Sequence, residues 1–193
     1  RERPAPTGLP PHPCAVDGVH YRATNGQLQA GLALADRITT VSPTYAAEIR
    51  TPAGGMGLDG LLRHRADALT GILNGIDDAL WNPETDVHLA QRFDASHLAR
   101  RAANKAALQA RLGLDVAPSA FLFGVVSRLT LQKGMDLLLE ALPTLIRHGA
   151  QLALLGAGDK PLEGAFAAAA ARHPGRVAAV IGYAEGLAHL MQG

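Results

Sequence analysis

The amino-acid sequence predicts an α/β protein with parallel strands, and three observations carry that prediction. Residues 121–126 form a short apolar run, as expected of a strand buried on both faces of a parallel sheet. Leucines then recur at helical spacing over residues 135–146. Apolar runs at 151–155 and 176–181 flank an alanine-rich stretch. Such alternation of strand and helix implies parallel strands joined by right-handed crossovers, as in a nucleotide-binding half-domain.

The composition indicates a globular chain without a strong overall charge. The 193 residues are 48% hydrophobic and 18% charged, and the formal net charge is +1 at pH 7. A chain of this length can bury a substantial core in one or two domains, and its charge predicts no nucleic-acid and no membrane partner. The single cysteine, Cys14, rules out an internal disulfide. With no signal-peptide or membrane-spanning pattern in the sequence, we expect a cytoplasmic protein.

The first elements in chain order are short. Residues 1–26 are rich in proline and lack periodicity, so we expect them to be irregular. The sequence then predicts a helix of small residues at 27–36 and a β-branched strand at 37–41. Ser42 is expected to cap the next helix, with Pro43 at its first position. A nucleophilic role for Ser42 is disfavoured because no G-x-S-x-G pattern surrounds it.

Glycines and turn residues dominate the next stretch. Residues 51–60 predict a glycine-rich loop, either a plain connector or a segment that closes over a substrate, before a short helix at 61–66. The strand expected over 70–77 contains Asn74-Gly75 near its end. Asn74 is either a simple turn residue or a hydrogen-bond partner for a ligand hydroxyl. We place a domain boundary near this turn.

Arg128 and Lys133 lie in the loop between the run at 121–126 and the helix at 135–146. This loop follows the carboxyl end of a predicted parallel strand, where open α/β sheets bind ligands. Gly134 allows close approach of the backbone to a ligand, and the helix N-terminus offers free N–H groups to phosphate oxygens. The two cations therefore point to an anion, although ordinary surface charges are the alternative. The loop is not a Walker A motif.

The remaining motifs are weaker signals when taken singly. A helix of strong helix formers is predicted over 96–112. Gly156-x-Gly158 is an incomplete dinucleotide-binding pattern. At the end of the last strand, Gly182-Tyr183 places an aromatic ring that either stacks on a base or packs within the fold. The eight histidines show no H-x-x-x-H and no paired Cys/His spacing, so no metal site is expected.

Together, the motifs resemble those of bacterial glycogen synthase and plant starch synthase. The resemblance covers about residues 30–188, whereas residues 1–26 do not match clearly. The motifs that carry it, in order along the chain, are Thr40-Val-Ser-Pro-Thr-Tyr45, Gly57-Leu-Asp-Gly60, Gly71-Ile-Leu-Asn-Gly-Ile-Asp77, Trp81-Asn-Pro-Glu-Thr-Asp86, Val125-Val-Ser-Arg-Leu-Thr130, Gln132-Lys-Gly134, Leu154-Leu-Gly-Ala-Gly-Asp159 and Ile181-Gly-Tyr183.

The resemblance implies an α/β fold of GT-B type. The end of an N-terminal Rossmann-like domain would be followed by a truncated C-terminal Rossmann-like, nucleotide-binding domain. The expected division is an irregular segment at 1–26, the end of the acceptor-side domain at 27–74, a hinge and connecting helix at 75–117, and the truncated nucleotide-sugar-binding domain at 118–193. Three family motifs are missing from these residues: a Lys-x-Gly-Gly-Leu loop, an active-site histidine and a downstream acidic motif. We therefore expect the central part of an enzyme, inactive alone.

The implied function is that of a retaining hexosyltransferase in glycogen biosynthesis. Such an enzyme transfers glucose from ADP-glucose to the non-reducing end of an α-1,4-glucan, without a cofactor. By position, Arg128 and Lys133 match the catalytic residues that hold the diphosphate. Asn74 matches a residue that lines the glucose site, and Gly182 and Tyr183 match the segment beside the adenine. Two alternatives stay open: another GT-B nucleotide-sugar transferase, and a non-enzymatic nucleotide- or glucan-binding fragment.

Overall fold

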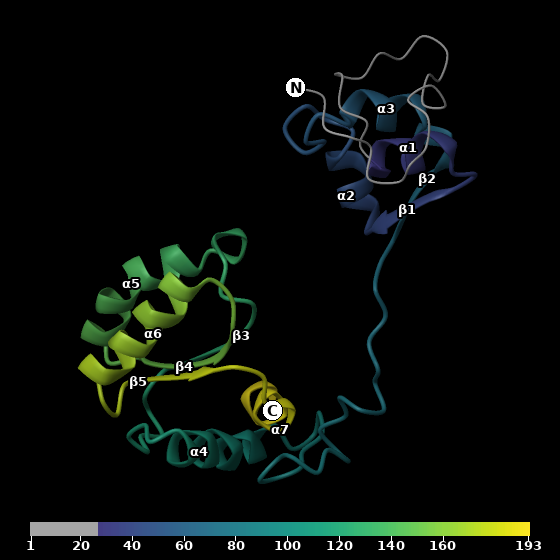
Figure 1. Cartoon of the computed structure of the whole chain (residues 1–193). Helices are drawn as coiled ribbons and strands as arrows, with labels where there is room; N and C mark the ends of the chain where they lie inside the picture. Colours follow the sequence, from purple (N-terminus) through teal and green to yellow (C-terminus); the bar gives the residue numbers. More distant parts are fainter. Residues whose placement is uncertain (1–26) are drawn as a thin grey trace. The chain divides into compact units, whose positions relative to one another are not determined.

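The computed structural model describes residues 27–193 (Figure 1). The irregular segment expected at 1–26, with Cys14, lies outside the described residues. The chain divides into two compact units, with the boundary between Ile76 and Asp77. The finer division at 27–74, 75–117 and 118–193 stays a prediction. None of the described helices is long and apolar enough to cross a membrane.

The described part of the first unit is a two-stranded parallel sheet with short helices. Its elements, in chain order, are α1 (Gln27–Leu34), β1 (Ile38–Val41), α2 (Pro43–Glu48), α3 (Asp59–His64), the 3-10 turn η1 (Ala66–Ala68) and β2 (Leu69–Ile72). Ile38 pairs with Leu69 in the register of the two strands. Turns at 51–57 connect α2 to α3, which begins at Asp59, earlier than predicted.

The turn from β1 into α2 confirms the predicted helix cap. The amide of Tyr45 donates a hydrogen bond to Ser42 Oγ at 3.0 Å, and Pro43 takes the first helical position. Ser42 has a φ of 84°, a region that side-chain-bearing residues rarely adopt. The backbone of β2 passes very close to this turn, because a Cβ on Gly71 would lie 2.2 Å from the carbonyl oxygen of Ser42. Only glycine fits at that point of β2.

The second unit is a parallel sheet between two layers of helices (Figure 1). Its elements, in chain order, are η2 (Leu98–Arg100), α4 (Arg101–Arg111), β3 (Leu122–Val126), η3 (Leu131–Lys133), α5 (Met135–Arg147), β4 (Gln151–Gly156), α6 (Lys160–Arg172), β5 (Val177–Ile181) and α7 (Glu185–Gln192). The strand order is β3-β4-β5, with every pairing parallel. The predicted alternation of strands and helices is therefore confirmed.

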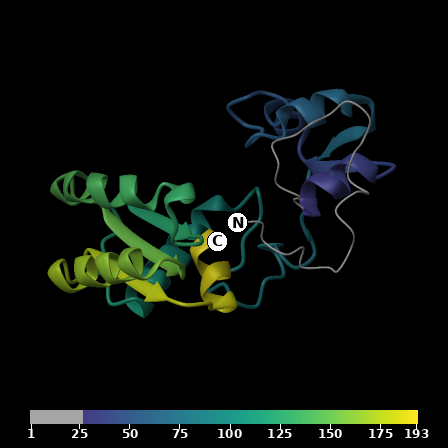
Figure 2. The same ribbon diagram turned by 45° about the horizontal axis from the view of Figure 1, so that its top comes forward.

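Alternate side chains of β4 enter two separate cores. Leu152 and Leu154 pack with Phe166 in the core beneath α5 and α6, which run side by side (Figures 1 and 2). Ala153 and Leu155 face the opposite core, which α4 and α7 cover. All six residues of β4 are buried, so this central strand matches the expectation for a strand covered on both faces.

The burial expected for the run at 121–126 is wrong. Phe121 is 70% exposed, Phe123 37% and Val126 43%. β3 is at the edge of the three-stranded sheet, and among the described residues it pairs with β4 alone. An apolar run predicts a strand, but its burial depends on which other segments flank it in the fold.

Two helices also differ from expectation. The helix predicted over 96–112 begins later, with η2 and then α4, because Asp94 holds the preceding residues in a turn. Its carboxylate oxygen Oδ1 accepts hydrogen bonds from the Ser96 amide at 2.7 Å and the His97 ring at 2.9 Å. Gly113, with a φ of 68°, follows the end of α4. Helix α7 was not predicted.

Candidate functional site

The loops that follow β3, β4 and β5 meet at the carboxyl ends of these strands. The Ser127 amide donates to the carbonyl of Leu155 at 3.2 Å, and the Gly182 amide donates to the carbonyl of Gly156 at 3.0 Å. Beyond the strands, Leu129 and Gly158 form a further parallel bridge. These bonds place the three loops at the carboxyl edge of the sheet, where parallel α/β folds bind ligands.

Arg128 and Lys133 are both exposed on the loop from β3 into α5. Arg128 Nη2 donates a hydrogen bond to Gln132 Oε1 at 3.3 Å, on the same loop. Within the described part of the chain, neither cation forms an ion pair. Neither side chain is therefore held in an ion pair by a carboxylate of residues 27–193.

The N-terminus of α5 adds to the positive potential beside these cations. Gly134 adopts the left-handed conformation, with a φ of 68°, and turns the chain from η3 into α5. The amide of Leu138 makes a helical hydrogen bond to the carbonyl of Gly134 at 3.1 Å. N–H groups in the first turn of a helix lack intrahelical partners and carry the positive end of the helix dipole. This arrangement suits a polyanion such as a diphosphate.

Gly156, the last residue of β4, and Gly158, in the loop that follows, lie close to the loop after β3. A Cβ on Gly156 would lie 1.9 Å from the carbonyl oxygen of Ser127, and one on Gly158 would lie 2.2 Å from that of Leu129. Both positions require glycine because backbone meets backbone there. The incomplete Gly156-x-Gly158 motif is thus explained by contact of the end of β4 and its following loop with the loop after β3.

The structure places the other predicted site residues as follows. Gly182 has a φ of 139°, and Tyr183 beside it is 87% exposed, so its ring adds nothing to the described core. Asn74 is exposed and lies beyond β2, which ends earlier than predicted, at Ile72. Asn74 belongs to the first unit, whereas Tyr183 and the cation loop belong to the second.

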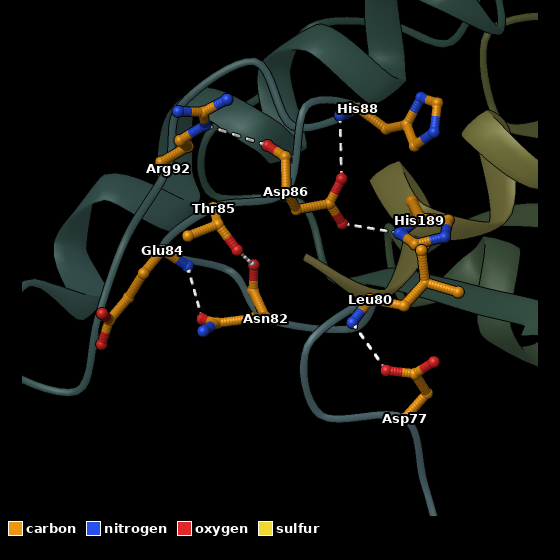
Figure 3. Close-up of polar contacts among 9 residues, drawn as sticks. All are labelled: Asp77, Leu80, Asn82, Glu84, Thr85, Asp86, His88, Arg92 and His189. Atoms are coloured by element: carbon orange, nitrogen blue, oxygen red, sulfur yellow. Dashed lines mark hydrogen bonds and ion pairs between the residues drawn. The ribbon is translucent and has the colours of Figure 1, made fainter.

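Sequence reasoning missed a buried polar cluster where the segment after Asp77 meets α7 (Figure 3). His189 Nδ1 lies 2.6 Å from Asp86 Oδ2, and these side chains are only 1% and 7% exposed. The Trp81 ring stacks on the His189 ring, with centroids 3.8 Å apart and planes 3° apart. The ring of His88 lies 4.9 Å from that of His189. His189 Nε2 is buried and has no hydrogen-bond partner among residues 27–193.

The segment around Asp86 is folded by short polar turns (Figure 3). Asp77 Oδ1 accepts from the Leu80 amide at 3.0 Å, and Asn82 Oδ1 accepts from the Glu84 amide at 2.9 Å. Asp86 Oδ1 accepts from the His88 amide at 2.8 Å. Burial alone would raise the pKa of Asp86, but hydrogen bonds from the His88 amide and the His189 ring lower it below its usual value.

No group of three or more His, Cys, Asp or Glu side chains within residues 27–193 is arranged to hold a metal ion. The candidate site therefore consists of two cations, a helix N-terminus and backbone amides. Such a set can bind a phosphorylated ligand and stabilise negative charge on it.

Known proteins resemble this chain along most of its length. A family profile described as "Starch synthase catalytic domain" matches residues 2–64. Glycogen synthases of Rhodopseudomonas palustris and Acidiphilium cryptum are 61% and 60% identical over 96% of this chain. The chain spans 38% and 39% of the lengths of these two relatives.

A solved structure supports the fold. The catalytic domain of starch synthase IV from Arabidopsis thaliana, bound to ADP and acarbose, matches with a TM-score of 0.79 and 37% sequence identity. The match covers 85% of this chain and 34% of that chain. The predicted α/β fold of GT-B type is thereby confirmed.

One expectation about the N-terminal residues is wrong. The profile match begins at residue 2, so the family resemblance extends into residues 1–26. That stretch has neither periodicity nor a short motif, and these were the only signals available from one sequence. With 61% identity to a glycogen synthase over 185 residues, and with the fold of a starch synthase catalytic domain, the chain is homologous to part of the glycogen synthases and starch synthases.

Proposed function

We propose that the protein to which this chain belongs transfers glucose from ADP-glucose to the non-reducing end of an α-1,4-glucan, with retention at the anomeric carbon. The observation that carries the proposal is the loop at 127–134, which holds two exposed cations at the carboxyl end of β3, beside the N-terminus of α5. Relatives about 60% identical to the chain are named glycogen synthases. The Arabidopsis starch synthase neighbour was solved with ADP.

In this proposal, Arg128 and Lys133 bind the diphosphate of the donor. Arg128 offers a planar set of N–H donors, and Lys133 offers a compact charge. As the bond between the anomeric carbon and the diphosphate oxygen breaks, negative charge grows on the departing ADP. Cations already in place stabilise that charge more than they stabilise the bound donor, which lowers the barrier.

The remaining assignments follow the family positions. Gly182 and Tyr183 border the adenine, because they follow β5 at the same sheet edge and the Tyr183 ring is 87% exposed. Asn74 lines the glucose site, where its side-chain amide can bond a sugar hydroxyl. A cytoplasmic location belongs to the same proposal, and the single cysteine of the sequence fits a reducing compartment.

A chimeric enzyme tests the proposal directly. The 193 residues replace the matching segment of the R. palustris glycogen synthase, and transfer of labelled glucose to glycogen is measured. We expect transfer from ADP-glucose, with kcat/KM at least about tenfold higher than for UDP-glucose, because polar groups shaped for one base are mismatched with another.

The parent R. palustris enzyme is the control for assay conditions. A folded chimera that transfers no glucose would contradict the proposal. Equal kcat/KM for ADP-glucose and UDP-glucose would instead favour a transferase with another nucleotide-sugar donor.

A further inference from the structure

Glu163 is a buried carboxylate in the first turn of α6, and the proposed chemistry does not use it. The residue is 8% exposed. Its Oε1 accepts a hydrogen bond from the Gly158 amide at 2.9 Å, and its Oε2 accepts one from Lys160 Nζ at 2.6 Å. The Lys160 ammonium and then the Gly158 amide lower the pKa of Glu163, so the carboxylate is charged at neutral pH.

Gly158 is the point where the loop after β4 contacts the loop after β3. Gly158 and Leu129 form a parallel bridge, the Leu129 amide donates to the carbonyl of Ala157 at 3.0 Å, and the Asp159 amide donates to the carbonyl of Leu129 at 2.8 Å. Leu129 is fully buried and lies directly after Arg128. The backbone hydrogen bonds between the two loops therefore involve Ala157 and Asp159, the two neighbours of Gly158. The amide of Gly158 itself donates to Glu163.

We propose that Glu163 is a positioning residue that fixes the loop carrying Arg128 and Lys133 by holding Gly158 against Leu129. Its carboxylate orients the Gly158 amide, and Gly158 then supports the backbone on which Arg128 is mounted. The loop has 3-10 and turn geometry, and its two cations are exposed, so its position depends on the contacts that its backbone makes. The consequence for donor binding rests on the function proposed above.

Amide hydrogen exchange in the full 193-residue chain tests the positioning role. The measured amides are those of Gly158, Leu129 and Asp159, with the amide of the buried strand residue Leu154 as a control for the fold. For Glu163→Ala we expect exchange at least about tenfold faster at the first three amides, since an acceptor bonded in charged form is lost. Glu163→Gln keeps an acceptor oxygen and is expected to stay within about threefold of the native chain.

Lys160→Ala is the matched control, because it removes the ion pair and leaves the Gly158 bond intact. The Lys160 side chain is 86% exposed. Amide exchange rates in Lys160→Ala should therefore also stay within about threefold of those in the native chain. Unchanged exchange at Gly158 and Leu129 in Glu163→Ala would overturn the proposal. Equal effects of the Ala and Gln substitutions, with Leu154 protected in both, would overturn it as well.

The chimeric enzyme separates this inference from the proposed function. There Glu163→Ala should lower kcat/KM for ADP-glucose at least about tenfold, and Glu163→Gln should restore it to within about threefold. If the chimera without any substitution is inactive, the proposed function is contradicted. Amide hydrogen exchange in the 193-residue chain would still decide whether Glu163 has the positioning role. An active chimera that keeps its kcat/KM in Glu163→Ala would overturn the link to the reaction.

Discussion

The cation loop around Arg128 and Lys133 and the Asp86–His189 pair belong to the same unit but are built in opposite ways. The cations are exposed and have no acidic partner within residues 27–193. His189 Nδ1 and Asp86 Oδ2 lie 2.6 Å apart, and the two side chains are 1% and 7% exposed. Exposed charges add little to folding and stay available to a ligand, whereas a buried pair is committed to the fold. Substitutions at the two places should therefore damage different properties.

The largest effect is expected at the buried pair. His189→Ala removes a ring stacked on Trp81 and leaves the buried Asp86 carboxylate without its partner. We expect the free energy of unfolding to fall by about 3 kcal/mol or more, measured by urea unfolding followed by circular dichroism.

The control for this substitution is His148→Ala, at the exposed end of α5. It should change the free energy of unfolding by less than about 0.5 kcal/mol. If His189→Ala and His148→Ala unfold at the same urea concentration, the buried pair does not stabilise the unit.

The opposite pattern is expected in the cation loop. In the chimeric enzyme, Arg128→Ala or Lys133→Ala should lower kcat about 10²-fold or more, because one preorganised donor at the leaving diphosphate is lost. The free energy of unfolding should change by less than about 0.5 kcal/mol, since both side chains are exposed. Steady-state kinetics with ADP-glucose and glycogen measure the first quantity.

Arg147→Ala provides the matched control at the other end of α5, where Arg147 is also exposed. Its kcat should stay within about twofold of the native chimera. An unchanged kcat in both Arg128→Ala and Lys133→Ala would remove the catalytic role assigned to the loop.

These two sites also differ in how far the sequence could predict them. Arg128 and Lys133 were predicted from local signals, an apolar run that stops before a leucine-rich helix, and the structure places both at the carboxyl end of β3. Asp86 and His189 are 103 residues apart along the chain and are brought together only by the packing of α7. No local pattern pairs such residues.

The strands show a similar limit. The run that forms β4 is buried at all six residues, whereas the run at 121–126 is partly exposed in β3, although both are apolar in the sequence. Composition predicts that a segment is extended, but burial depends on whether it becomes a central or an edge strand. Whether a strand is central or at an edge depends on the strand order of the sheet, and the local sequence pattern does not predict that order.

Acid should weaken the buried pair. The folded-state pKa of Asp86 is lowered by the hydrogen bonds of its buried site, so its carboxylate stabilises the folded state above the unfolded pKa of about 3.9. This stabilisation is lost as the pH falls from that value through the lower folded-state pKa. The free energy of unfolding, measured between about pH 6 and pH 2, should therefore decline in acid more steeply for the native chain than for Asp86→Asn.

Asp78→Asn, at an exposed position of the same segment, serves as the control for general charge effects. It should retain the acid decline of the native chain. Identical pH profiles for the native chain and Asp86→Asn would show that this carboxylate does not contribute to the acid sensitivity.

The smallest effect is expected for substitution of Tyr183, whose aromatic ring is exposed. Trp81 stacks on His189, whereas Tyr183 is 87% exposed and has no stacked ring among the described residues. If Tyr183 borders the adenine, Tyr183→Ala should weaken ADP binding to the chimeric enzyme about three- to tenfold in calorimetric titrations. Tyr183→Phe keeps the ring and should bind ADP within about twofold of the native chimera. Equal affinities for the native, Ala and Phe forms would place the adenine elsewhere, because loss of a stacking surface cannot leave the binding free energy unchanged.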